Sequence, residues 1–560
     1  MNRREFLRVM SVGAGVTVVA ACAPSPAAPA PAPTAAAKPA GTSAAAPAPT
    51  AGVAATAAPT GAPAAAPTSA AQPSSGGTLK FGQNVEIAAG GAAGASPLDG
   101  QNISPAPLSA IWLGYDSLIR YDDSFKPQPM LAESWDVSSD FRKIKLNLRK
   151  NVTFHNGREF TSDDVQYNIL RVRQPNVGAQ FTNMSKWWTS IETPDKYTVE
   201  LTSDQPRPAL FDFFDTMNMV NKDVTEDPDL FIKTSGSTGP FKFVEYVQGD
   251  HIRWTKNPNY WQSGRPYLDE VMIRFFGDAQ SMVVNFESGQ IDVVDAPPLK
   301  DAQRLKQDSK YRVLVNDLSG QYWVLVMNTT AGATQNQKVR QALNYAIDRK
   351  RFIDTALAGI GEPEALPWLP NTPAYDESKR SMYAFDLDKA KAMIADSGLS
   401  DVSLDFVFNS VVPEIAAFAQ IYQADLAKIG VKLNIKGVER AVYNDLAAKF
   451  QYGTLMSNSG FANFDPATLP LLSRYWDPNN NLAGMNDNAD YKQLVNSAST
   501  EPDPSRRKTT LSSLNDLILD QSFSIPMATG KHVTAVRSNV NGFRWRASEA
   551  VDYTSIWLSA

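Results

Sequence analysis

Cys22 is the only cysteine of the 560-residue chain, and its neighbours predict that its sulfur is modified. Val19-Ala20-Ala21 places small apolar residues directly before it, which is the pattern of a lipoprotein cleavage site. At such a site, cleavage makes the cysteine the new N-terminus, and its thiol carries the lipid. We therefore expect Cys22 to be a lipid anchor, which leaves no thiol for a disulfide or for catalysis.

The residues before Cys22 have the pattern of an export signal. Arg3 and Arg4 open the segment Arg3-Arg4-Glu5-Phe6-Leu7, which resembles a twin-arginine signal. The apolar stretch from Val9 to Ala21 is too short, and too rich in Gly and Ser, to span the ~30 Å hydrocarbon core of a membrane. We therefore expect residues 1–21 to be a cleaved leader and not a transmembrane helix.

Residues 22–75 predict a tether that begins at the lipidated cysteine. From residue 23 on they are almost wholly Ala, Pro, Thr, Ser and Gly, with Lys38 as the only charge. Such a segment lacks the apolar surface that could offset the entropy of ordering a core. Frequent Pro favours extended conformers, whose reach at ~3.1 Å per residue is on the order of 150 Å. The tether would hold a folded body clear of a membrane surface.

The other reactive side chains form no recognisable catalytic pattern. His155, His251 and His532 have no partner three or four residues away, so neither a zinc helix motif nor a Ser-His-Asp order is indicated. Gly76-Gly77 and Gly90-Gly91 lack the Lys and the helix that a phosphate loop needs. Paired carboxylates for glycoside hydrolysis come from distant positions and stay open at this point. We expect no enzyme, no cofactor and no metal site.

The body from Gly76 to Ala560 is too long for one hydrophobic core, so two or more lobes are expected. The formal net charge of the chain is −5, and its basic stretches, such as Arg506-Arg507-Lys508, are no longer than three residues. Nucleic acid is therefore not an expected partner.

Strand and helix patterns alternate along this body. Helical spacing joins Leu108 to Ile119, a capping box starts at Thr161 and predicts a helix to about Arg173, and residues 241–254 indicate a hairpin. A helix, a glycine and a strand follow one another twice, around Gly289 and around Gly430. The remaining predicted strands are 78–87, 144–148, 322–328 and 402–408, and further helices are 339–347 and 388–396. The alternation predicts α/β layers in more than one lobe.

Seven short segments add a family pattern. They are Ala132-Glu133-Ser134-Trp135-Asp136, residues 148–157 (LRKNVTFHNG), residues 161–165 (TSDDV), Gly239-Pro240-Phe241, residues 257–261 (NPNYW), residues 289–292 (GQID) and residues 339–348 (VRQALNYAID). In this order they resemble solute-binding protein family 5, the extracytoplasmic oligopeptide/dipeptide-binding cluster that serves peptide-type ABC importers.

The resemblance implies a bilobed α/β fold like that of periplasmic binding proteins, with three structural domains and a hinge. By family topology, the first lobe combines residues 76–108, 237–330 and 523–560, a domain is inserted at 109–236, and the second lobe is 331–522. It also implies an exported monomer that delivers a peptide-like or other polar solute to an ABC permease and its ATPases. The alternative is a surface lipoprotein with a hydrolytic or purely structural role.

The resemblance also points to residues late in the second lobe. Family members that bind peptides have an aromatic residue followed three positions on by an Asp that pairs with the amino group of the ligand. Here Phe461 takes the aromatic place, but Phe464 stands three residues on, between Asn463 and Asp465. Either Asn463 replaces the anchor, with the loss of a charge-assisted hydrogen bond, or Asp465 substitutes for it. Asp before Pro is also a common turn former, and both readings stay open.

Further ligand-binding candidates are mostly aromatic. Trp187 and Trp188 lie in a segment that can border the cleft in the family, and Glu86 ends the first predicted strand. Tyr322 and Trp323 open a strand near the expected hinge, where alternation places one of them on each face. Core packing is the alternative for each aromatic. With Asp465 in a turn, these residues would favour a neutral or amine-blocked solute that stacks on Phe461 and on one of the two tryptophans.

Overall fold

Three β-sheets form the framework of residues 71–560, which make up one compact unit. The computed structural model describes residues 72–84, 98–101, 108–177, 179, 181–231, 233–234, 236–317, 319–370, 372–461, 465–466, 468–547 and 550–559. The predicted leader, Cys22, most of the tether, Glu86, Asn463 and the side chain of Phe461 lie outside this description. Within it, no helix has the length and apolar composition needed to cross a membrane.

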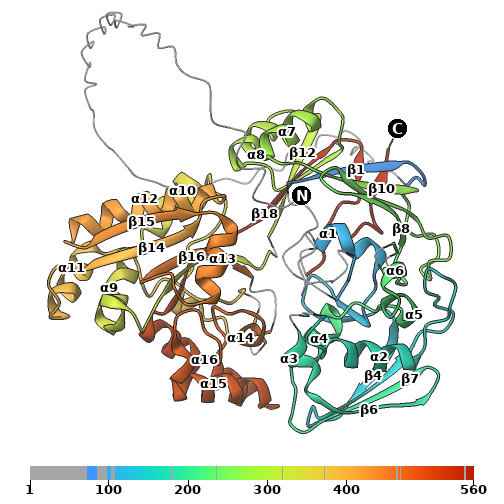
Figure 1. Ribbon diagram of the computed structural model, residues 1–560, viewed down its shortest axis with the longest axis horizontal. Helices are drawn as coiled ribbons and strands as arrows, with labels where there is room; N and C mark the ends of the chain where they lie inside the picture. The colour runs from blue at the N-terminus through green and yellow to red at the C-terminus, as the bar shows by residue number, and fades with distance from the viewer. Residues whose placement is uncertain are drawn as a thin grey trace, which may run out of the picture. The chain divides into compact units, whose positions relative to one another are not determined.

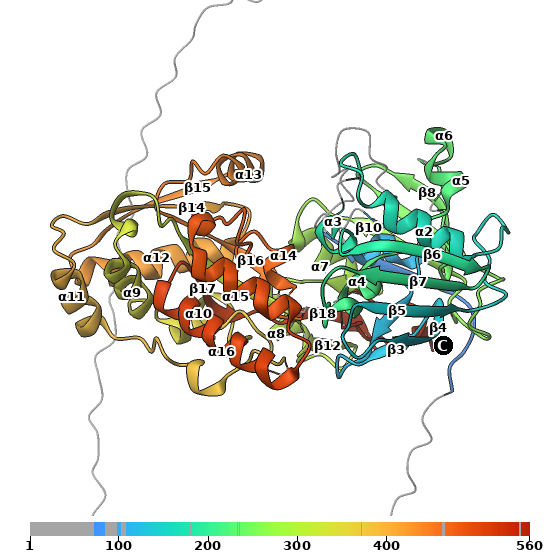
Figure 2. The same ribbon diagram turned by 90° about the horizontal axis from the view of Figure 1, so that it is seen from below.

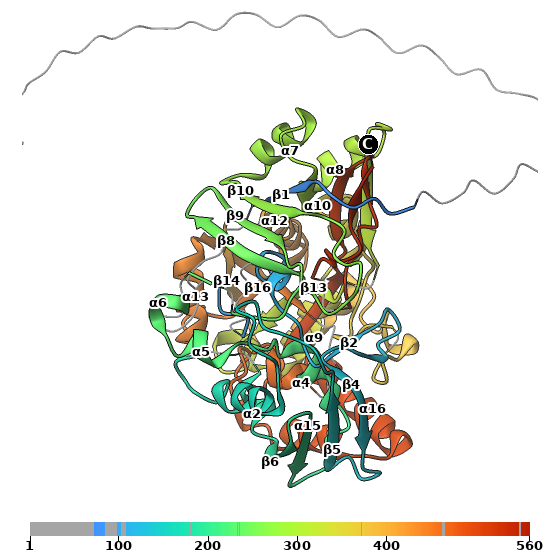
Figure 3. The ribbon, with the colours of Figure 1, turned by 90° about the vertical axis from the view of Figure 1, so that its right-hand side faces the viewer.

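The first lobe is built on a seven-stranded sheet. Its spatial order is β12 (Tyr311–Asn316), β18 (His532–Arg537), β11 (Val293–Asp295), β1 (Thr78–Gln83), β10 (Glu270–Phe275), β9 (His251–Lys256) and β8 (Phe241–Val247). β1 runs parallel to both β10 and β11, and the β8–β9 hairpin confirms the predicted one. Figure 3 shows β8, β9, β10 and β1 side by side. Leu79 and Phe81 of β1 are fully buried in the core of this lobe.

Helices of the first lobe pack around β11. They are α7 (Ala279–Glu287) and α8 (Leu299–Leu305). Met282, Phe286 and Leu305 share a small core with Val294 of β11. At the far end of the chain, β19 (Val540–Asn541) pairs with β20 (Trp557–Leu558).

The inserted domain carries a four-stranded antiparallel sheet. Its spatial order is β4 (Ala132–Val137), β5 (Lys143–Leu148), β7 (Thr198–Ser203) and β6 (Trp188–Asp195). Helix α2 (Ser162–Arg171) lies over β6 and β7, as Figure 2 shows. The predicted capping box of α2 is confirmed, with Thr161 and Asp164 each bonding the other's backbone. The remaining elements are β2 (Ile119–Tyr121), β3 (Pro127–Pro129), α3 (Thr182–Ser185), α4 (Leu210–Thr216), α5 (Lys222–Thr225) and α6 (Pro228–Phe231).

The second lobe has a five-stranded sheet with helices on both faces (Figure 1). Its spatial order is β15 (Lys432–Val438), β14 (Ser403–Asn409), β16 (Leu455–Phe461), β13 (Gln321–Met327) and β17 (Ser524–Thr529). The main helices are α9 (Gln337–Tyr345), α10 (Arg349–Ala356), α11 (Leu387–Asp396), α12 (Pro413–Lys428), α13 (Arg440–Ala448), α14 (Leu469–Leu472), α15 (Ala489–Thr500) and α16 (Pro504–Gln521). The predicted helix, glycine and strand at Gly430 are confirmed, because α12 ends at Lys428, Gly430 has φ of 78° and β15 begins at Lys432.

Two short connections join the first and second lobes. One runs from β12 to β13 and the other from β17 to β18, and the Gly530 N–H donates to the Gln321 carbonyl at 2.7 Å where they meet. β13 and β17 thus belong to the sheet of the second lobe. The boundaries expected from family topology placed residues 321–330 and 523–529 with the first lobe. The difference lies at the two connections between the lobes, where boundaries taken from a resemblance do not specify which sheet each strand joins.

The predicted helical run from Leu108 to Ile119 is helical only at its start. Helix α1 covers Leu108–Ile111, a 3₁₀ turn covers Trp112–Gly114, and the backbone is extended at Tyr115. A Cβ on Gly239 would lie 2.3 Å from the carbonyl carbon of Gly114, so the chain is pressed against this turn. Residues 110–119 are all buried, and an apolar run without an exposed face carries no reliable helical period.

Candidate functional site

Asp212 is the point at which the inserted domain meets the second lobe. It lies on α4 and is 2% exposed. Its Oδ2 accepts a hydrogen bond from the Asp465 N–H at 2.8 Å and another from the Thr468 hydroxyl. Its Oδ1 accepts from the Tyr121 hydroxyl at 2.8 Å. Three donors from two separate segments, Tyr121 and the turn from Asp465 to Thr468, therefore converge on one carboxylate.

No cationic side chain among the described residues forms an ion pair with Asp212. Its pKa is therefore set by burial, by the nearby Asp465 charge and by its hydrogen bonds. Burial and the nearby Asp465 charge raise the pKa of Asp212 to about 7, although its hydrogen bonds lower the pKa in part. Burial also raises the pKa of Asp215, one turn along α4, to about 6. The Tyr121 N–H donates to Asp215 at 3.0 Å. Two carboxyl groups on α4 therefore have pKa values raised toward neutral pH, and Asp212 bonds the second lobe.

Asp465, one of the two candidates for an amine anchor, is engaged within its own lobe. Its Oδ2 accepts from Nη1 of Arg507 at 3.0 Å, and a second contact makes the pair bidentate. The Arg507 Nε donates to the Ala498 carbonyl at 2.9 Å. The Asp465 carbonyl accepts from the N–H groups of Thr468 and Leu469, which forms the turn that opens α14. Asp465 thus forms a turn, and a guanidinium already compensates its charge.

A hollow of about 280 Å³ lies between the inserted domain and the second lobe. It is lined by Trp187, Arg207, Pro478, Asn479, Lys492, Val495, Asn496 and Ser499. The Arg207 guanidinium lies 5.1 Å from the centre of the Trp187 ring, and Lys492 brings a second cation from α15. Among the predicted aromatic residues whose side chains the structure describes, Trp187 therefore borders this hollow.

Trp188, Tyr322 and Trp323, the other predicted aromatic residues with described side chains, pack within single domains. Trp188 is 1% exposed and stacks on Phe214 at 5.6 Å in the core of the inserted domain. Tyr322 accepts a hydrogen bond from Nε1 of Trp476 at 2.6 Å. Trp323 packs edge-on against Phe352, which belongs to the core on the opposite face of the sheet. The predicted alternation of Tyr322 and Trp323 is confirmed, and in this structure packing holds both rings.

Sequence reasoning missed Tyr121, Asp212 and Thr468, and it treated Arg507 only as part of a basic stretch. Asp212 left one usable signal, since it is an acidic residue inside the apolar segment Leu210-Phe211-Asp212-Phe213-Phe214. A carboxylate on the buried side of a helix needs a hydrogen-bond donor or a cation as its partner. The identity of that partner depends on a contact across more than 250 positions.

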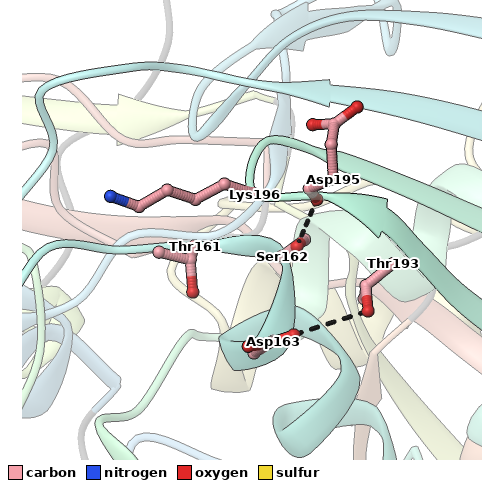
Figure 4. Close-up of a pocket in the computed structure, with 6 residues that line it drawn as sticks. All are labelled: Thr161, Ser162, Asp163, Thr193, Asp195 and Lys196. Atoms are coloured by element: carbon pink, nitrogen blue, oxygen red, sulfur yellow. Dashed lines mark hydrogen bonds between the residues drawn. The ribbon is translucent and has the colours of Figure 1, made fainter.

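A second hollow, of about 430 Å³, lies at the start of α2 and is shown in Figure 4. The Ser162 hydroxyl donates to the Asp195 carbonyl at 2.7 Å, and Thr193 lies 3.4 Å from Asp163. Lys196 pairs with Glu159. Because these polar groups bond with their own neighbours, the hollow is not a candidate binding site. The described residues also hold no cluster of three or more His, Cys, Asp or Glu side chains that could bind a metal ion.

Comparison with known proteins gives a family match. The model of the bacterial extracellular solute-binding proteins, family 5, matches residues 126–481. Heme-binding protein A of Haemophilus influenzae is 29% identical over 466 residues, which cover 77% of this chain and 84% of the relative. The glutathione-binding protein GsiB of Escherichia coli K12 is 26% identical over 444 residues, which cover 77% of this chain and 86% of the relative.

Solved structures agree with the architecture described above. The binding protein AgaA from A. tumefaciens R10, in complex with agropinic acid, has a TM-score of 0.72 at 25% identity and covers 86% of this chain and 99% of its own. The oligopeptide-binding protein AppA of Bacillus subtilis, in complex with a nonapeptide, has a TM-score of 0.74 at 21% identity. The match covers 87% of this chain and 100% of AppA. The predicted bilobed α/β fold is confirmed by these similarities.

Proposed function

The chain belongs to family 5 of the bacterial extracellular solute-binding proteins, and from this premise we propose that it is the lipid-anchored receptor of an ABC importer. It is a solute-binding component of transport located outside the cytoplasm, and it is not an enzyme. The proposal adds the anchor at Cys22, the twin-arginine export route, and delivery of the solute to two permease and two ATPase subunits. The predicted absence of catalysis is confirmed by the family.

The observation that carries the proposal is the contact between the lobes. Asp212 of the inserted domain bonds Asp465 and Thr468 of the second lobe, and only two short connections join the sheets of the two lobes. Paired crossings restrict relative motion to rotation about a hinge. A solute enclosed between such lobes changes which surface the protein presents to a permease.

The proposed solute is polar and lacks a free amino group. An ammonium group that enters the site needs a carboxylate, and the Asp465 carboxylate is held bidentately by Arg507. To serve as an amine anchor, Asp465 would have to release a guanidinium that is itself 8% exposed. Removing the partner of a buried charge costs several kcal/mol. This cost favours a solute without an ammonium group, which binds while Asp465 stays paired with Arg507.

Titration calorimetry tests this solute class. We expect unmodified di- to pentapeptides to bind at least tenfold more weakly than the same peptides with acetylated amino groups, because only the former bring an unpaired cation. Each acetylated peptide is the matched control for its parent, since side chains and length are unchanged. Submicromolar binding of the free-amine peptides would contradict the proposal.

The anchor is tested by fractionation. Cys22→Ala removes the sulfur that would carry the lipid, so the protein should remain folded but leave the membrane fraction. Exchange of both Arg3 and Arg4 for Lys should block export and leave an uncleaved precursor. Lys38→Arg, the reverse exchange within the tether, is the control. It should change neither membrane retention nor export. Membrane retention of the Cys22→Ala protein would disprove the lipid anchor.

A further inference from the structure

Four buried polar atoms without a hydrogen-bond partner lie in the first lobe, near the carboxyl ends of β1 and β11. They are Oε1 of Gln83, Nε1 of Trp545, Nε of Arg546 and Oη of Tyr553, and no described residue bonds any of them. Buried polar groups in folded proteins are nearly always hydrogen-bonded. In α/β sheets, ligands bind beyond the carboxyl ends of the strands. Buried polar atoms without a partner, at the carboxyl ends of parallel strands, therefore indicate a ligand-binding surface.

Printed contacts bring these residues to the same edge of the sheet. Gln83 and Asp295 are the last residues of β1 and β11, which run parallel with Gly82 opposite Val294. The ring of Tyr553 lies 5.9 Å from that of Phe81, two residues before Gln83.

The same edge receives the segment that carries Trp545 and Arg546. The ring of Trp545 lies 6.0 Å from that of His532, and His532 is 2.6 Å from the Asp295 carboxylate. The Arg546 N–H donates to the Ala550 carbonyl, and Trp545 pairs with Val551, so a tight turn fixes both side chains.

Arg546 is the unusual member of this group. The residue is 8% exposed, yet its guanidinium forms no ion pair or hydrogen bond with any described residue. The charges of Asp552 and Asp116 attract Arg546 and raise its pKa in part, but neither carboxylate bonds its guanidinium, and the Asp552 oxygens accept from Arg544 and from Thr554. Burial and the charge of Arg120 lower the pKa of Arg546 to about 10, so it stays protonated at neutral pH. A buried unpaired cation is costly unless an anion meets it.

Arg120 supplies a second guanidinium, whose charge acts on Arg546 and lowers its pKa. Its side chain is 16% exposed and lies 3.8 Å from the Asp116 carboxylate. Asp116 already accepts from the Tyr260 hydroxyl at 3.1 Å and from Nε1 of Trp261 at 3.0 Å. Arg120 therefore keeps donors that the described residues do not use. It also precedes Tyr121, which bonds Asp212 at the contact between the lobes.

We propose that Arg546 and Arg120 together bind an oxyanion of the solute, such as a carboxylate, on the first-lobe side of the cleft. This inference rests on the proposed function and adds that the solute is acidic. Guanidinium groups bind carboxylates through paired, charge-assisted hydrogen bonds, which fix orientation as well as affinity. An oxyanion held here lies beside the segment of Tyr121, so that binding favours the contact of Tyr121 and Asp212 with the second lobe.

Solute capture by the full-length protein tests this inference. The protein is incubated with the low-molecular-weight fraction of a cell extract, washed and examined by native mass spectrometry. We expect the wild type to retain a solute with a carboxylate or phosphate group. Arg546→Gln and Arg120→Gln should each weaken its binding by about 10- to 100-fold, the loss typical of a hydrogen bond to a charged group. Arg544→Gln is the matched control, because Arg544 is 65% exposed and paired with Asp552, and it should change binding less than threefold.

The outcomes separate this inference from the proposed function. Retention of a neutral solute, or unchanged affinity in Arg546→Gln, would overturn the oxyanion site and leave the proposed function intact. If the wild type retains nothing, both fall. Folding is checked by the thermal midpoint of the solute-free proteins. Arg546→Gln removes both the desolvation cost of the buried guanidinium and its attraction to Asp552 and Asp116, so these two effects oppose each other and no marked drop is expected. A marked drop would indicate a structural role and count against the inference. Arg546→Lys keeps the charge but not the planar fork, and should bind with intermediate affinity.

Discussion

Asp465→Asn is expected to lower the free energy of unfolding by about 3–5 kcal/mol, which makes it one of the most damaging single changes in the second lobe. Asparagine preserves the turn before α14 but removes the charge that faces Arg507. The side chains of this pair are 18% and 10% exposed, so water does not replace the lost carboxylate. Urea unfolding followed by tryptophan fluorescence measures the change.

A double-mutant cycle isolates the pair as the cause. Arg507→Met removes the buried charge, so Asp465→Asn combined with Arg507→Met should recover most of the stability that Asp465→Asn loses. Glu501→Gln is the control on the same side of the lobe, because it breaks the pair with Arg506, whose side chain is 68% exposed. That change should leave the unfolding midpoint nearly unchanged. Simple addition of the two losses in the double variant would show that Arg507 is not stabilised through Asp465.

Raising the pH through neutrality is expected to weaken the contact between the lobes. Burial and the charge of Asp465 raise the pKa of Asp212 from an ordinary 3.8 to about 7, although the bonds from Thr468, the Asp465 N–H and Tyr121 lower it in part. A raised pKa means that the closed form holds a proton that the open form releases. The stabilisation is therefore complete below about pH 4, declines as the pH rises, and is lost above about pH 7. Each pKa unit that contact with the second lobe adds corresponds to about 1.4 kcal/mol.

The pH effect is measured by the distance between labels placed on the two lobes, recorded from pH 5 to pH 8. Asp212→Asn should abolish the change near pH 7, since its amide does not titrate. Asp215 titrates in the same direction at about pH 6, under the influence of Arg120 and Arg546, and Asp215→Asn separates its contribution. The other titratable groups that face Asp212 are Tyr121 and Asp465. An unchanged pH profile in Asp212→Asn would refute this assignment.

Patterns that depend on neighbouring residues predicted much of the fold. Thr161 and Asp164 form a capping box because both partners lie within one turn, and Gly430 ends α12 because its own φ is positive. Tyr322 and Trp323 point to opposite faces because strand geometry forces alternation. Each of these conclusions needed only a few consecutive residues.

The candidate site was less predictable because its contacts join distant segments. Asp212 bonds Asp465 across more than 250 positions, and Arg546 approaches Arg120 across more than 400. Trp187 and Trp188 are identical in type and adjacent in sequence, and both belong to the core of the inserted domain, yet Trp187 also borders the hollow between the domains, whose lining does not include Trp188. Spacing and residue type do not encode such differences, which arise from how the domains pack.

The position of β18 has a consequence for how the protein is synthesised. This strand lies between β12 and β11 in the first-lobe sheet, although the whole second lobe precedes it in the sequence. On the ribosome, the N-terminal lobe therefore waits for residues 532–537 before its sheet is continuous, whereas the strands of the second lobe all emerge between 321 and 529. The lobe that begins first is completed last, which reverses the usual N-terminal-first order of domain folding. A premature stop before His532 would leave β12 without its neighbour and the first lobe unfinished.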